Sequence, residues 1–374
     1  MTKLRVQLKK TVDESYDIII GRKLTETLIR DIHTNFADRI YKVAVLTDSN
    51  VEALYGREFL WALQNVGIHC DLFTFPSGEK NKSREIKIRV EDEMIASGYG
   101  RDSLIIALGG GMVSDLSGFI ASTFCRGIPY INYSTTLLSA ADAAIGGKTA
   151  VNTPAATNLI GSFYQPSTVY ADLETWNTLS VREFRSGLAE TIIHACLGDF
   201  QFFEYLELHA PTLFDSNSLC LQWDICEYIV RQNCEIKYKV VMKDEKEDNY
   251  RKVLNLGHTI GRALEASAEY KYLHGEAVAI GLVAEARLAN HLGFLKSEDV
   301  ERIIRLLGSV GLPTECPKDI DPQLLIRKMY TDKKTRNGNI NLVLMNGIGE
   351  MRKSSGGSYA FPVDEQKILS VLCS

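Results

Sequence analysis

Short apolar runs alternate with stretches of helical spacing in the first half of the chain. Residues 42–48 form an apolar run that ends in a polar turn, as a buried parallel strand does. Residues 51–66 have helical spacing and are followed by a second strand-like run at 70–75. Residues 85–97 again have helical spacing and are followed by a third strand-like run at 104–108. Repeated strand–helix–strand units predict a parallel sheet with helices on both faces, a layout that binds ligands at the carboxyl ends of its strands.

The pattern changes near residue 180. Four long stretches then carry helical periodicity: 184–209, 224–241, 258–270 and 276–291. Strand-like residues return only at 341–345. At 374 residues the chain is too long for one ordinary core. We therefore predict two domains, a Rossmann-like α/β domain with a parallel sheet over residues 1–180 and a mostly α-helical domain over residues 181–374.

The charge balance and composition exclude some classes of protein. A formal net charge of -5 gives no general attraction for a phosphate backbone, so we expect no nucleic-acid partner. Residues 1–10 lack the apolar core of a signal peptide, and no stretch approaches the roughly 20 apolar residues of a membrane helix. The eight cysteines are scattered without a CxxC pair, which is typical of reduced thiols in a cytoplasmic protein.

A glycine triplet is the first candidate for nucleotide binding. Gly109, Gly110 and Gly111 follow a predicted strand and lead into residues 116–123, which can form a helix. Backbone N–H groups of such a turn can approach a pyrophosphate at the amino end of a helix. The GxGxxG fingerprint is absent, and a tight structural turn is about as good an interpretation of the triplet.

Two further loops follow predicted strands. Glu79 and Lys82 lie in one of them and offer a carboxylate for ribose hydroxyls and a cation for phosphate, or else form a solvated turn. Thr135 and Thr136 end the strand over 130–133, where their hydroxyls either meet a cofactor or cap the helix that follows.

Candidate metal ligands lie in the second half. His258 and His274 stand in glycine-flanked positions that each open a predicted helix, and Glu190 lies among apolar residues of an earlier helix. Two imidazoles and a carboxylate suit a catalytic zinc or a related divalent ion. His194 competes with them, because it lies four residues after Glu190 on the same helix face. Spacing does not choose between these sets.

Several cations have polar neighbours and are candidates for binding an anionic substrate: Arg126, Lys148, Lys237, Arg251, Arg262, Lys333 and Lys334. A solvated surface charge is the ordinary alternative for each of them. Lys148 is the exception, because it is flanked by two glycines and a threonine in a stretch of small residues.

These segments, in this order, resemble 3-dehydroquinate synthase and the related sugar phosphate cyclases over roughly residues 40–350. The matching stretches are 109–115, 126–127, 135–138, 142–152, 158–166, 187–190, 254–261 and 273–279. The ordered combination is far more specific than any single piece.

The resemblance implies an active site between a nicotinamide-binding domain and a helical metal-binding domain. It implies Zn2+ or Co2+ on Glu190, His258 and His274, which leaves His194 out of the ligand set. The positions that match the family's NAD contacts are Asp48, Asn50, Glu79, Lys82, Gly110, Gly111, Asp115, Thr135, Thr136, Thr178, Leu179 and Glu183.

The resemblance also implies which residues contact the substrate. Asp142, Lys148, Asn158, Lys237, Arg251 and Asn255 match its catalytic and substrate-contacting positions. Its phosphate contacts correspond to Arg126 and to Lys333 or Lys334, and Arg262 adds a cation suited to phosphate. Three positions depart from the family's pattern: Thr157 and Ile193 each replace a lysine, and Arg262 replaces a histidine.

The activity implied by the resemblance is a closed redox cycle of the shikimate pathway. NAD+ oxidises a ring hydroxyl of 3-deoxy-D-arabino-heptulosonate 7-phosphate, phosphate is eliminated, the hydride returns, and an aldol reaction closes 3-dehydroquinate. Arg251 and Lys148 are our candidates for binding the substrate carboxylate. A homodimer is implied as well.

Three alternatives stay open at this point. The departures at Thr157, Ile193 and Arg262 also fit a cyclase of secondary metabolism that acts on an amino analogue or on sedoheptulose 7-phosphate. Metal-dependent alcohol or glycerol dehydrogenases have a similar architecture. A non-catalytic paralogue is the third alternative.

Overall fold

The first domain is built on a parallel sheet. The computed structural model describes residues 4–5, 7, 12–154, 156–215, 218–268, 271–330 and 340–372. Six strands pair in the order β1-β8-β5-β4-β2-β3, and every neighbouring pair is parallel. Their bounds are β1 Asp17–Gly21, β2 Lys42–Asp48, β3 Cys70–Phe75, β4 Ser103–Gly109, β5 Tyr130–Ser134 and β8 Thr168–Asp172. The predicted parallel sheet is confirmed.

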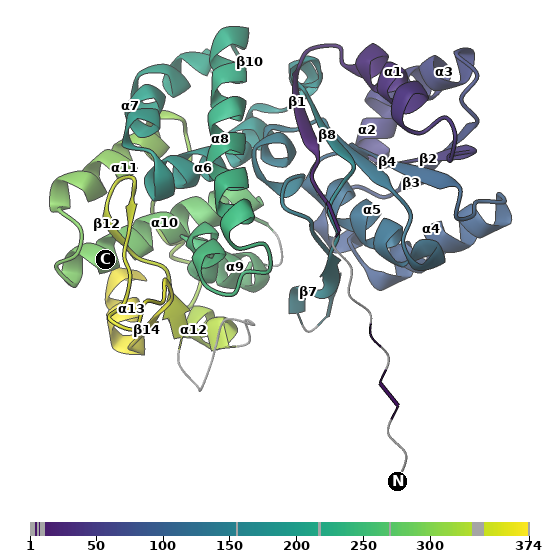
Figure 1. The fold of residues 1–374 in the computed structure, drawn as a ribbon. Helices are drawn as coiled ribbons and strands as arrows, with labels where there is room; N and C mark the ends of the chain where they lie inside the picture. The colour runs from purple at the N-terminus through teal and green to yellow at the C-terminus, as the bar shows by residue number, and fades with distance from the viewer. Residues whose placement is uncertain are drawn as a thin grey trace.

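Helices cover both faces of this sheet (Figure 1). One face packs against α1 (Thr25–Asn35) and α3 (Arg57–Asn65), the other against α4 (Arg84–Ala96) and α5 (Gly111–Thr123). The alternation along β2 explains this, because Val43 and Val45 belong to the first core and Ala44 and Leu46 to the second. Short α2 (Ser49–Val51) and a π-helical turn at Glu52–Gly56 lead into α3.

A hairpin leaves the sheet after β5. β6 (Lys148–Thr153) and β7 (Ala156–Phe163) pair with each other in antiparallel register. Gly146 and Gly147 precede β6 with φ of 91° and 67°. Such left-handed backbone suits glycine, and it redirects the chain from the π-helical segment Ser139–Ala143 into the hairpin.

The second half is mostly helical, as predicted. Its helices are α6 Val181–Gly198, α7 Phe200–His209, α8 Trp223–Lys243, α9 His258–Ser267, α10 His274–His291, α11 Ser297–Ser309, α12 Pro322–Tyr330 and α13 Glu365–Leu372. Its strands are short pairs: β9 Phe214–Asp215 with β10 Ser218–Leu219, β11 Ile340–Leu342 with β14 Phe361–Val363, and β12 Met345–Gly347 with β13 Glu350–Met351. The domain boundary near residue 180 stays a prediction.

Two of the predicted stretches differ in detail. The helical stretch 184–209 is two helices, because Asp199 adopts φ -155°, ψ 103° and its carboxylate caps the backbone N–H of Phe202. The strand-like residues 341–345 belong to two strands that pair with different partners. Predicted helix 258–270 ends at Ser267, and residues 269–270 lie outside the described residues.

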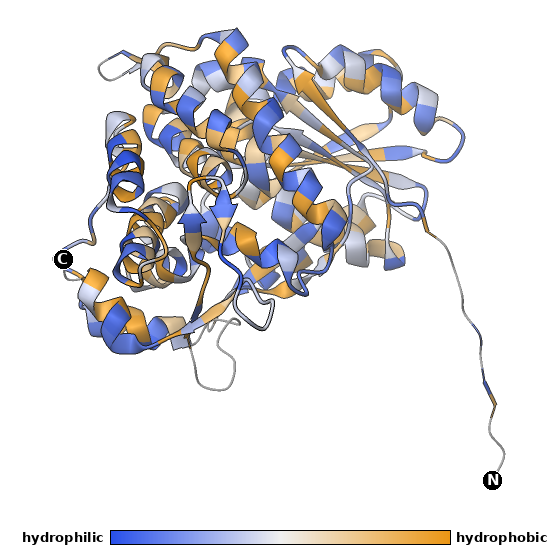
Figure 2. Ribbon diagram, turned by 60° about the vertical axis from the view of Figure 1, so that its left-hand side comes forward, coloured by the Kyte–Doolittle hydropathy of each residue, from blue (hydrophilic) through white to orange (hydrophobic). Residues whose placement is uncertain are grey.

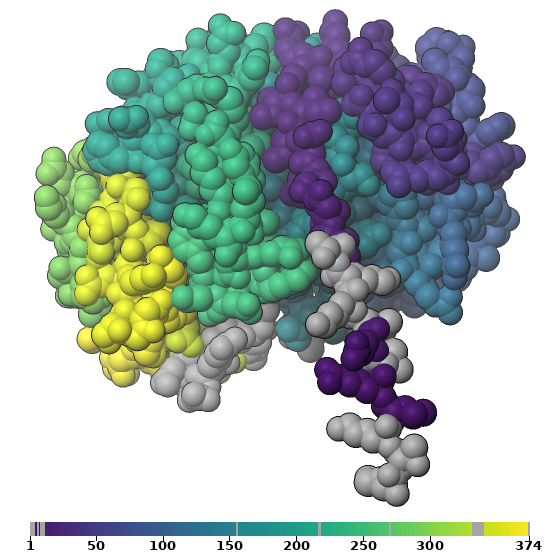
Figure 3. All heavy atoms as spheres, in the orientation of Figure 1, coloured from purple at the N-terminus to yellow at the C-terminus, as the bar shows by residue number. Residues whose placement is uncertain are grey.

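The two halves lie side by side, with α8 next to β1 (Figures 1 and 3). Surface helices carry hydrophilic and hydrophobic residues on the same helix (Figure 2), because one side of each packs on a core. No helix among the described residues has the length and apolar character that crossing a membrane requires. The cysteines that the structure describes are all free.

Candidate active site

Glu190 lies where three helices meet. It projects from the middle of α6, whereas His258 and His274 are the first residues of α9 and α10. Oε1 of Glu190 lies 3.2 Å from Nε2 of His258 and 3.0 Å from Nε2 of His274. One ligand atom from each of the three residues falls within 4.8 Å of the others. The structure therefore brings the expected metal-ligand set together.

Each imidazole is oriented by a contact of its other nitrogen. Nδ1 of His258 lies 3.0 Å from the carbonyl oxygen of Leu256, and Nδ1 of His274 lies 3.1 Å from Oε2 of Glu265. Both oxygens accept, so each ring carries a hydrogen on Nδ1 and turns Nε2 to Glu190. This is the arrangement that orients histidine ligands in metal sites. The donor set and its orientation thus fit a divalent cation.

The electrostatics of the three side chains depend on one another. Burial alone would raise the pKa of Glu190, but the adjacent imidazoles of His258 and His274 hold it well below its ordinary value. Burial lowers the pKa of His258. Burial acts in the same direction on His274, yet the carboxylates of Glu265 and Glu190 raise its pKa well above the ordinary value. The site therefore keeps an ionised carboxylate in a buried position.

Glycines permit the helix ends to approach one another. A Cβ on Gly275 would lie 2.0 Å from the carbonyl oxygen of Ser186, so no other residue lets the start of α10 lie against α6. Gly257 has φ of 76°, and a Cβ there would lie 2.8 Å from the carbonyl oxygen of Val278. The glycines beside both histidines are thus explained by the close contact of α6, α9 and α10.

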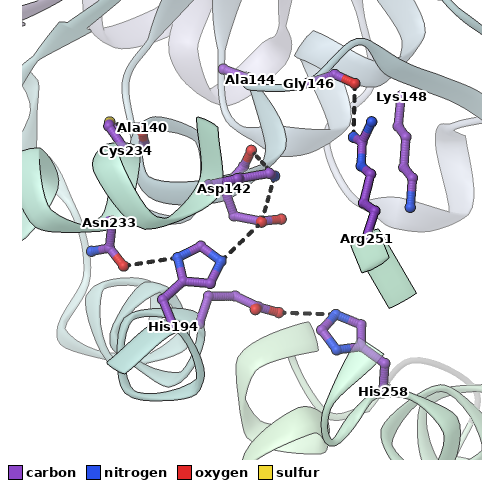
Figure 4. A network of polar contacts seen from close by, with 12 residues as sticks. Ala140, Asp142, Ala144, Gly146, Lys148, His194, Asn233, Cys234, Arg251 and His258 are labelled. Atoms are coloured by element: carbon purple, nitrogen blue, oxygen red, sulfur yellow. Dashed lines mark hydrogen bonds and ion pairs between the residues drawn. The ribbon is translucent and has the colours of Figure 1, made fainter. Parts of the chain in front are cut away.

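Asp142 lies next to this cluster. Its Oδ1 is 2.5 Å from Nζ of Lys237 and 3.5 Å from Nε2 of His194 (Figure 4). Burial would raise the pKa of Asp142, but Lys237 and His194 hold it well below its ordinary value. Asp142, Glu190 and His194 also offer ligand atoms within 4.8 Å of one another. The structure thus keeps His194 beside the site, although its other ring nitrogen is turned to Asn233.

Lys148 and Arg251 lie together on the other side of Asp142 (Figure 4). Nζ of Lys148 is 2.5 Å from Oε2 of Glu247, and Nδ2 of Asn255 is 2.5 Å from Oε1 of the same carboxylate. The buried guanidinium of Arg251 donates to the carbonyl oxygens of Gly146 (2.7 Å) and Glu245 (2.5 Å). The expected substrate-contacting cations are therefore held at the junction of the two halves.

Asn158 lies on the hairpin next to Asn152, whose amide contacts Glu79. It lies in β7 with a left-handed φ of 54°, and its backbone N–H donates to Oδ1 of Asn152 at 3.0 Å. Its side-chain oxygen is buried and has no hydrogen-bond partner among the described residues. A non-glycine residue with positive φ and an unsatisfied oxygen is typical of a ligand-binding position.

The expected NAD contacts lie at the carboxyl ends of neighbouring strands. Asp48 ends β2 and accepts hydrogen bonds from the backbone of Asn50 (2.8 Å) and Val51 (3.1 Å). A Cβ on Gly110 would lie 3.2 Å from Thr136, so the turn after β4 touches the end of β5. The hydroxyl of Thr135 is buried without a hydrogen-bond partner among the described residues. These features leave backbone and hydroxyl groups for a ligand at this edge.

Lys82 is placed between two carboxylates. Its buried Nζ lies 2.6 Å from Glu79 and 3.0 Å from Asp115. Burial opposes its charge, but these two carboxylates raise its pKa above the ordinary value, whereas burial raises the pKa of Asp115. Thr178 bonds the hydroxyl of Tyr55 at 2.5 Å, and it precedes Leu179 and the exposed Glu183. Lys82 thus organises two acidic groups in the loop region.

The expected phosphate contacts are spread over the chain. Arg262 lies on α9 one turn after His258, half-buried, and makes no hydrogen bond or ion pair with any described residue. Arg126 is exposed just after α5, at the end of that helix remote from Gly111. Lys333 and Lys334 lie outside the described residues. Ile193 is fully buried in the helical core.

Three residues of the site were not predicted from the sequence: Glu265, Glu247 and Asn233. Glu265 follows His258 by seven residues, which is two helical turns on one face, so spacing contained a usable signal. Glu247 belongs to the segment 244–248, in which four of five residues are acidic, and its positive φ of 63° becomes visible only in the structure. Asn233 had no local signal, because its contact with His194 joins α8 to α6.

Comparisons with known proteins identify the same family over most of the chain. The family model described as 3-dehydroquinate synthase N-terminal matches residues 72–186, and that described as 3-dehydroquinate synthase C-terminal matches residues 187–335. A 3-dehydroquinate synthase of Thermodesulfovibrio yellowstonii is 40% identical over 357 residues, covering 94% of this chain and 96% of that protein. Another, of Pelobacter propionicus, is 43% identical and covers 90% and 92%.

Solved structures agree with this assignment of the fold. A 2-epi-5-epi-valiolone synthase of Streptomyces hygroscopicus subsp. jinggangensis, solved with NAD+ and Zn2+, has a TM-score of 0.86 at 27% identity, covering 99% of this chain and 98% of that one. A probable glycerol dehydrogenase of Sinorhizobium meliloti has a TM-score of 0.64 at 17% identity and covers 96% of each chain. The latter resemblance concerns the fold alone.

Proposed function

The chain belongs to the 3-dehydroquinate synthase family, and on that basis we propose that it converts 3-deoxy-D-arabino-heptulosonate 7-phosphate to 3-dehydroquinate with release of phosphate. One observation carries the proposal. The cluster of Glu190, His258 and His274 lies beside Asp142, and Ala143 next to it is 3.0 Å from the Cβ position of Gly111. We therefore place the substrate in the space between this cation cluster and the glycine turn after β4.

The cofactors that fit this space are NAD+ and Zn2+ or Co2+. Two imidazoles oriented through Nδ1 and one carboxylate suit such a cation. The glycine turn after β4, together with the unpaired hydroxyl of Thr135, suits a dinucleotide. When bound, NAD+ takes up and returns one hydride, and the cation polarises the hydroxyl on the reacting carbon.

The side chains around this space bind and orient the sugar phosphate. Lys148, Arg251 and Asn255 lie at the domain junction, where they present donors to the carboxylate and hydroxyls of the substrate. Asp142 accepts a substrate hydroxyl through the carboxylate that Lys237 holds. Arg262 binds the phosphate, and its guanidinium stabilises the phosphate anion that leaves by elimination. Arg126 and Lys333 or Lys334 are further candidates for this role.

The Glu247 carboxylate already contacts Lys148 and Asn255, which supports a carboxylate-binding role for the pair. On this basis an Arg251→Ala variant loses affinity for the heptulosonate, because one cation of the group is removed. Unchanged affinity would remove the argument that the substrate carries a carboxylate.

A specialised cyclase is the second candidate. The fully buried Ile193 carries no charge where the family has a lysine, and the valiolone synthase shares this architecture at 27% identity. An amino analogue of the heptulosonate or sedoheptulose 7-phosphate is the substrate class in that case.

The test is release of inorganic phosphate from each candidate heptulose phosphate, with NAD+ and Zn2+ or Co2+ present. The proposal expects release from the heptulosonate without net NADH, since the hydride is returned. Release only from sedoheptulose 7-phosphate or the amino analogue would assign the specialised activity. Accumulation of NADH would instead indicate a dehydrogenase. Absence of both NAD+ affinity and bound metal would indicate a non-catalytic paralogue.

We also propose that the enzyme acts in the cytoplasm as a homodimer, without a nucleic-acid or membrane partner. The net charge of -5 supports the absence of a nucleic-acid partner. Light scattering of the purified chain tests the dimer.

A further inference from the structure

A buried polar chain lies behind Asp142. His194, Asn233 and Thr191 are all inaccessible to solvent, and they join α6 to α8. Nδ2 of Asn233 donates to the carbonyl oxygen of Ile229 at 2.9 Å and to the hydroxyl of Thr191 at 3.0 Å. These two bonds use both amide hydrogens, so Oδ1 of Asn233 is an acceptor only.

The acceptor fixes the form of the histidine. Oδ1 of Asn233 lies 3.0 Å from Nδ1 of His194, and the hydrogen of that contact must therefore be on Nδ1 (Figure 4). Nε2 then points away from Asn233 toward Asp142, where it lies 3.5 Å from Oδ1. This nitrogen has no hydrogen bond with any part of the chain that the structure describes. A buried ring is thus held in one orientation with one nitrogen turned to the site.

Two neighbours address the same oxygen of Asp142. Nζ of Lys237 lies 2.5 Å from Oδ1, the oxygen that also faces His194. Oδ2 makes no hydrogen bond with the described residues, and about a quarter of the side chain, 26%, is exposed. In Figure 4 this second oxygen is turned away from His194, toward the side where Lys148 and Arg251 lie. Asp142 is therefore anchored through one oxygen and presents the other.

Neither a second cation nor packing alone explains this arrangement. Asp142, Glu190 and His194 are near enough to hold an ion, but Lys237 already neutralises Asp142. Three polar side chains in the core are costly unless every hydrogen bond is made, and apolar residues of similar size would pack as well. A buried nitrogen without a hydrogen bond costs free energy, and a function of Nε2 in the site explains why this cost is retained.

We propose that His194 is a positioning residue for Asp142. Asn233, anchored by Thr191, accepts the Nδ1 hydrogen of the imidazolium, and the Nε2 hydrogen faces Oδ1 of Asp142. With Lys237 this ring fixes the carboxylate so that Oδ2 accepts a hydroxyl of the bound sugar phosphate. The identity of that sugar phosphate rests on the proposed function, whereas the orientation of His194 does not.

A double-mutant cycle tests whether the chain acts through Asp142. Asn233→Leu, which keeps the size but removes the acceptor, is combined with Asp142→Asn. We expect Asn233→Leu to lower kcat about tenfold in the native background and less than about twofold in the Asp142→Asn background. KM for NAD+ and the content of bound metal stay unchanged, because Glu190, His258 and His274 are untouched. Equal effects in both backgrounds would overturn the proposal.

Two further measurements separate positioning from general destabilisation. Thr191→Val is milder, since it removes one anchor of Asn233 and keeps the shape, and we expect a smaller loss of kcat in the same direction. Asn290→Leu serves as the matched control, because Asn290 is 16 residues beyond His274 on α10, about 24 Å along the helix.

Ring-nitrogen NMR of His194 provides a readout independent of turnover. We expect a protonated Nδ1 in the native protein and in Thr191→Val, and loss of that signal in Asn233→Leu. An unprotonated Nδ1 in the native protein would overturn the inference. If the native enzyme releases no phosphate from the heptulosonate, the proposed function fails alone. The cycle is then measured with whichever heptulose phosphate is turned over, and the NMR result stands by itself.

Discussion

Oε2 of Glu265 accepts a hydrogen bond from Nδ1 of His274 at 3.1 Å, and this contact turns the other nitrogen of the ring toward Glu190. Glu265 lies on α9, two turns after His258, so a single helix supplies one imidazole and the orienting group of the other. Burial would raise the pKa of Glu265, but the adjacent His274 lowers it, so Glu265 is an ionised acceptor. The cation site thus depends on a residue outside its ligand set.

Replacing Glu265 should weaken the cation site without removing a ligand. We expect Glu265→Gln to lower metal affinity about 10–100-fold, because the neutral amide no longer fixes the Nδ1–H form as strongly. Competition with a chelator, followed by metal analysis, measures this. Glu298→Gln on the exposed side of α11 is the control and should keep native affinity. Equal metal retention in both variants would contradict the prediction.

The glycine turn after β4 makes a separate prediction about the nucleotide. Gly110 has an ordinary φ of -83°, so alanine is tolerated by the backbone, but its methyl group would lie 3.2 Å from Thr136. The methyl group also occupies the surface that a pyrophosphate approaches. We expect Gly110→Ala to weaken NAD+ binding about tenfold or more, measured by isothermal titration calorimetry.

Gly308→Ala is the matched control for this variant. Gly308 lies inside α11, and a Cβ there has no atom within 4 Å. Alanine should therefore leave NAD+ affinity unchanged and stabilise the helix by about 0.5–1 kcal/mol. Equal NAD+ affinity for Gly110→Ala and the native chain would argue against pyrophosphate binding at this turn.

Local sequence patterns predicted those elements whose buried residues form a regular pattern within one continuous stretch of the sequence. The runs at 42–48, 70–75 and 104–108 are strands as expected, because consecutive apolar residues are needed where both faces of a sheet are covered. β1 was not predicted, since its residues become part of the sheet only by pairing with β8, about 150 residues away. The break at Asp199 was not predicted, because apolar residues on both sides of it continue the helical spacing.

The candidate site shows the same division. Glu190, His258 and His274 were found from residue type, glycine context and the family resemblance, and the structure places them together. The contact of Asn233 with His194 and that of Glu247 with Lys148 join segments from different elements. Side-chain contacts between segments that are distant in the sequence produce no periodic pattern along the chain, so only the packed structure reveals them.

Arg262 makes a prediction about phosphate. It lies one turn after His258 without a hydrogen bond to the described residues, and a charge-assisted hydrogen bond contributes about 1.5–3 kcal/mol. We expect Arg262→Leu to raise KM for the sugar phosphate about 10–100-fold and to leave NAD+ affinity unchanged. Arg262→Lys should lose less, because it keeps the charge but not the planar fork.

The control for Arg262 is Arg305→Leu. Arg305 is exposed on α11, and its ion-pair partner among the described residues is Glu301, at 3.5 Å. Steady-state kinetics should give native KM values for this variant. If KM for the sugar phosphate were the same in Arg262→Leu and Arg305→Leu, phosphate binding by Arg262 would be excluded.

Asp244 makes a prediction about stability and pH. Its carboxylate accepts hydrogen bonds from the backbone of Asp248 (2.8 Å), Asn249 (2.8 Å) and Arg251 (2.9 Å). Burial opposes the charge, but together these N–H groups lower the pKa of Asp244 below its ordinary value. A folded pKa below the unfolded value of about 3.9 means that this stabilisation is present above about pH 4. It is lost as the pH falls through the folded pKa.

Asp244→Asn should therefore destabilise the protein by about 1–2 kcal/mol near pH 7, because a neutral amide accepts these bonds less strongly. The difference in free energy of unfolding between native and variant should shrink as the pH falls below about 4, measured by urea unfolding across the pH range. Asp319→Asn is the control, since Asp319 is exposed and its contact with Lys271, at 3.7 Å, is a loose surface ion pair. A native–variant difference that stayed constant from pH 7 into acid would mean that ionisation of Asp244 does not stabilise the loop that carries Arg251.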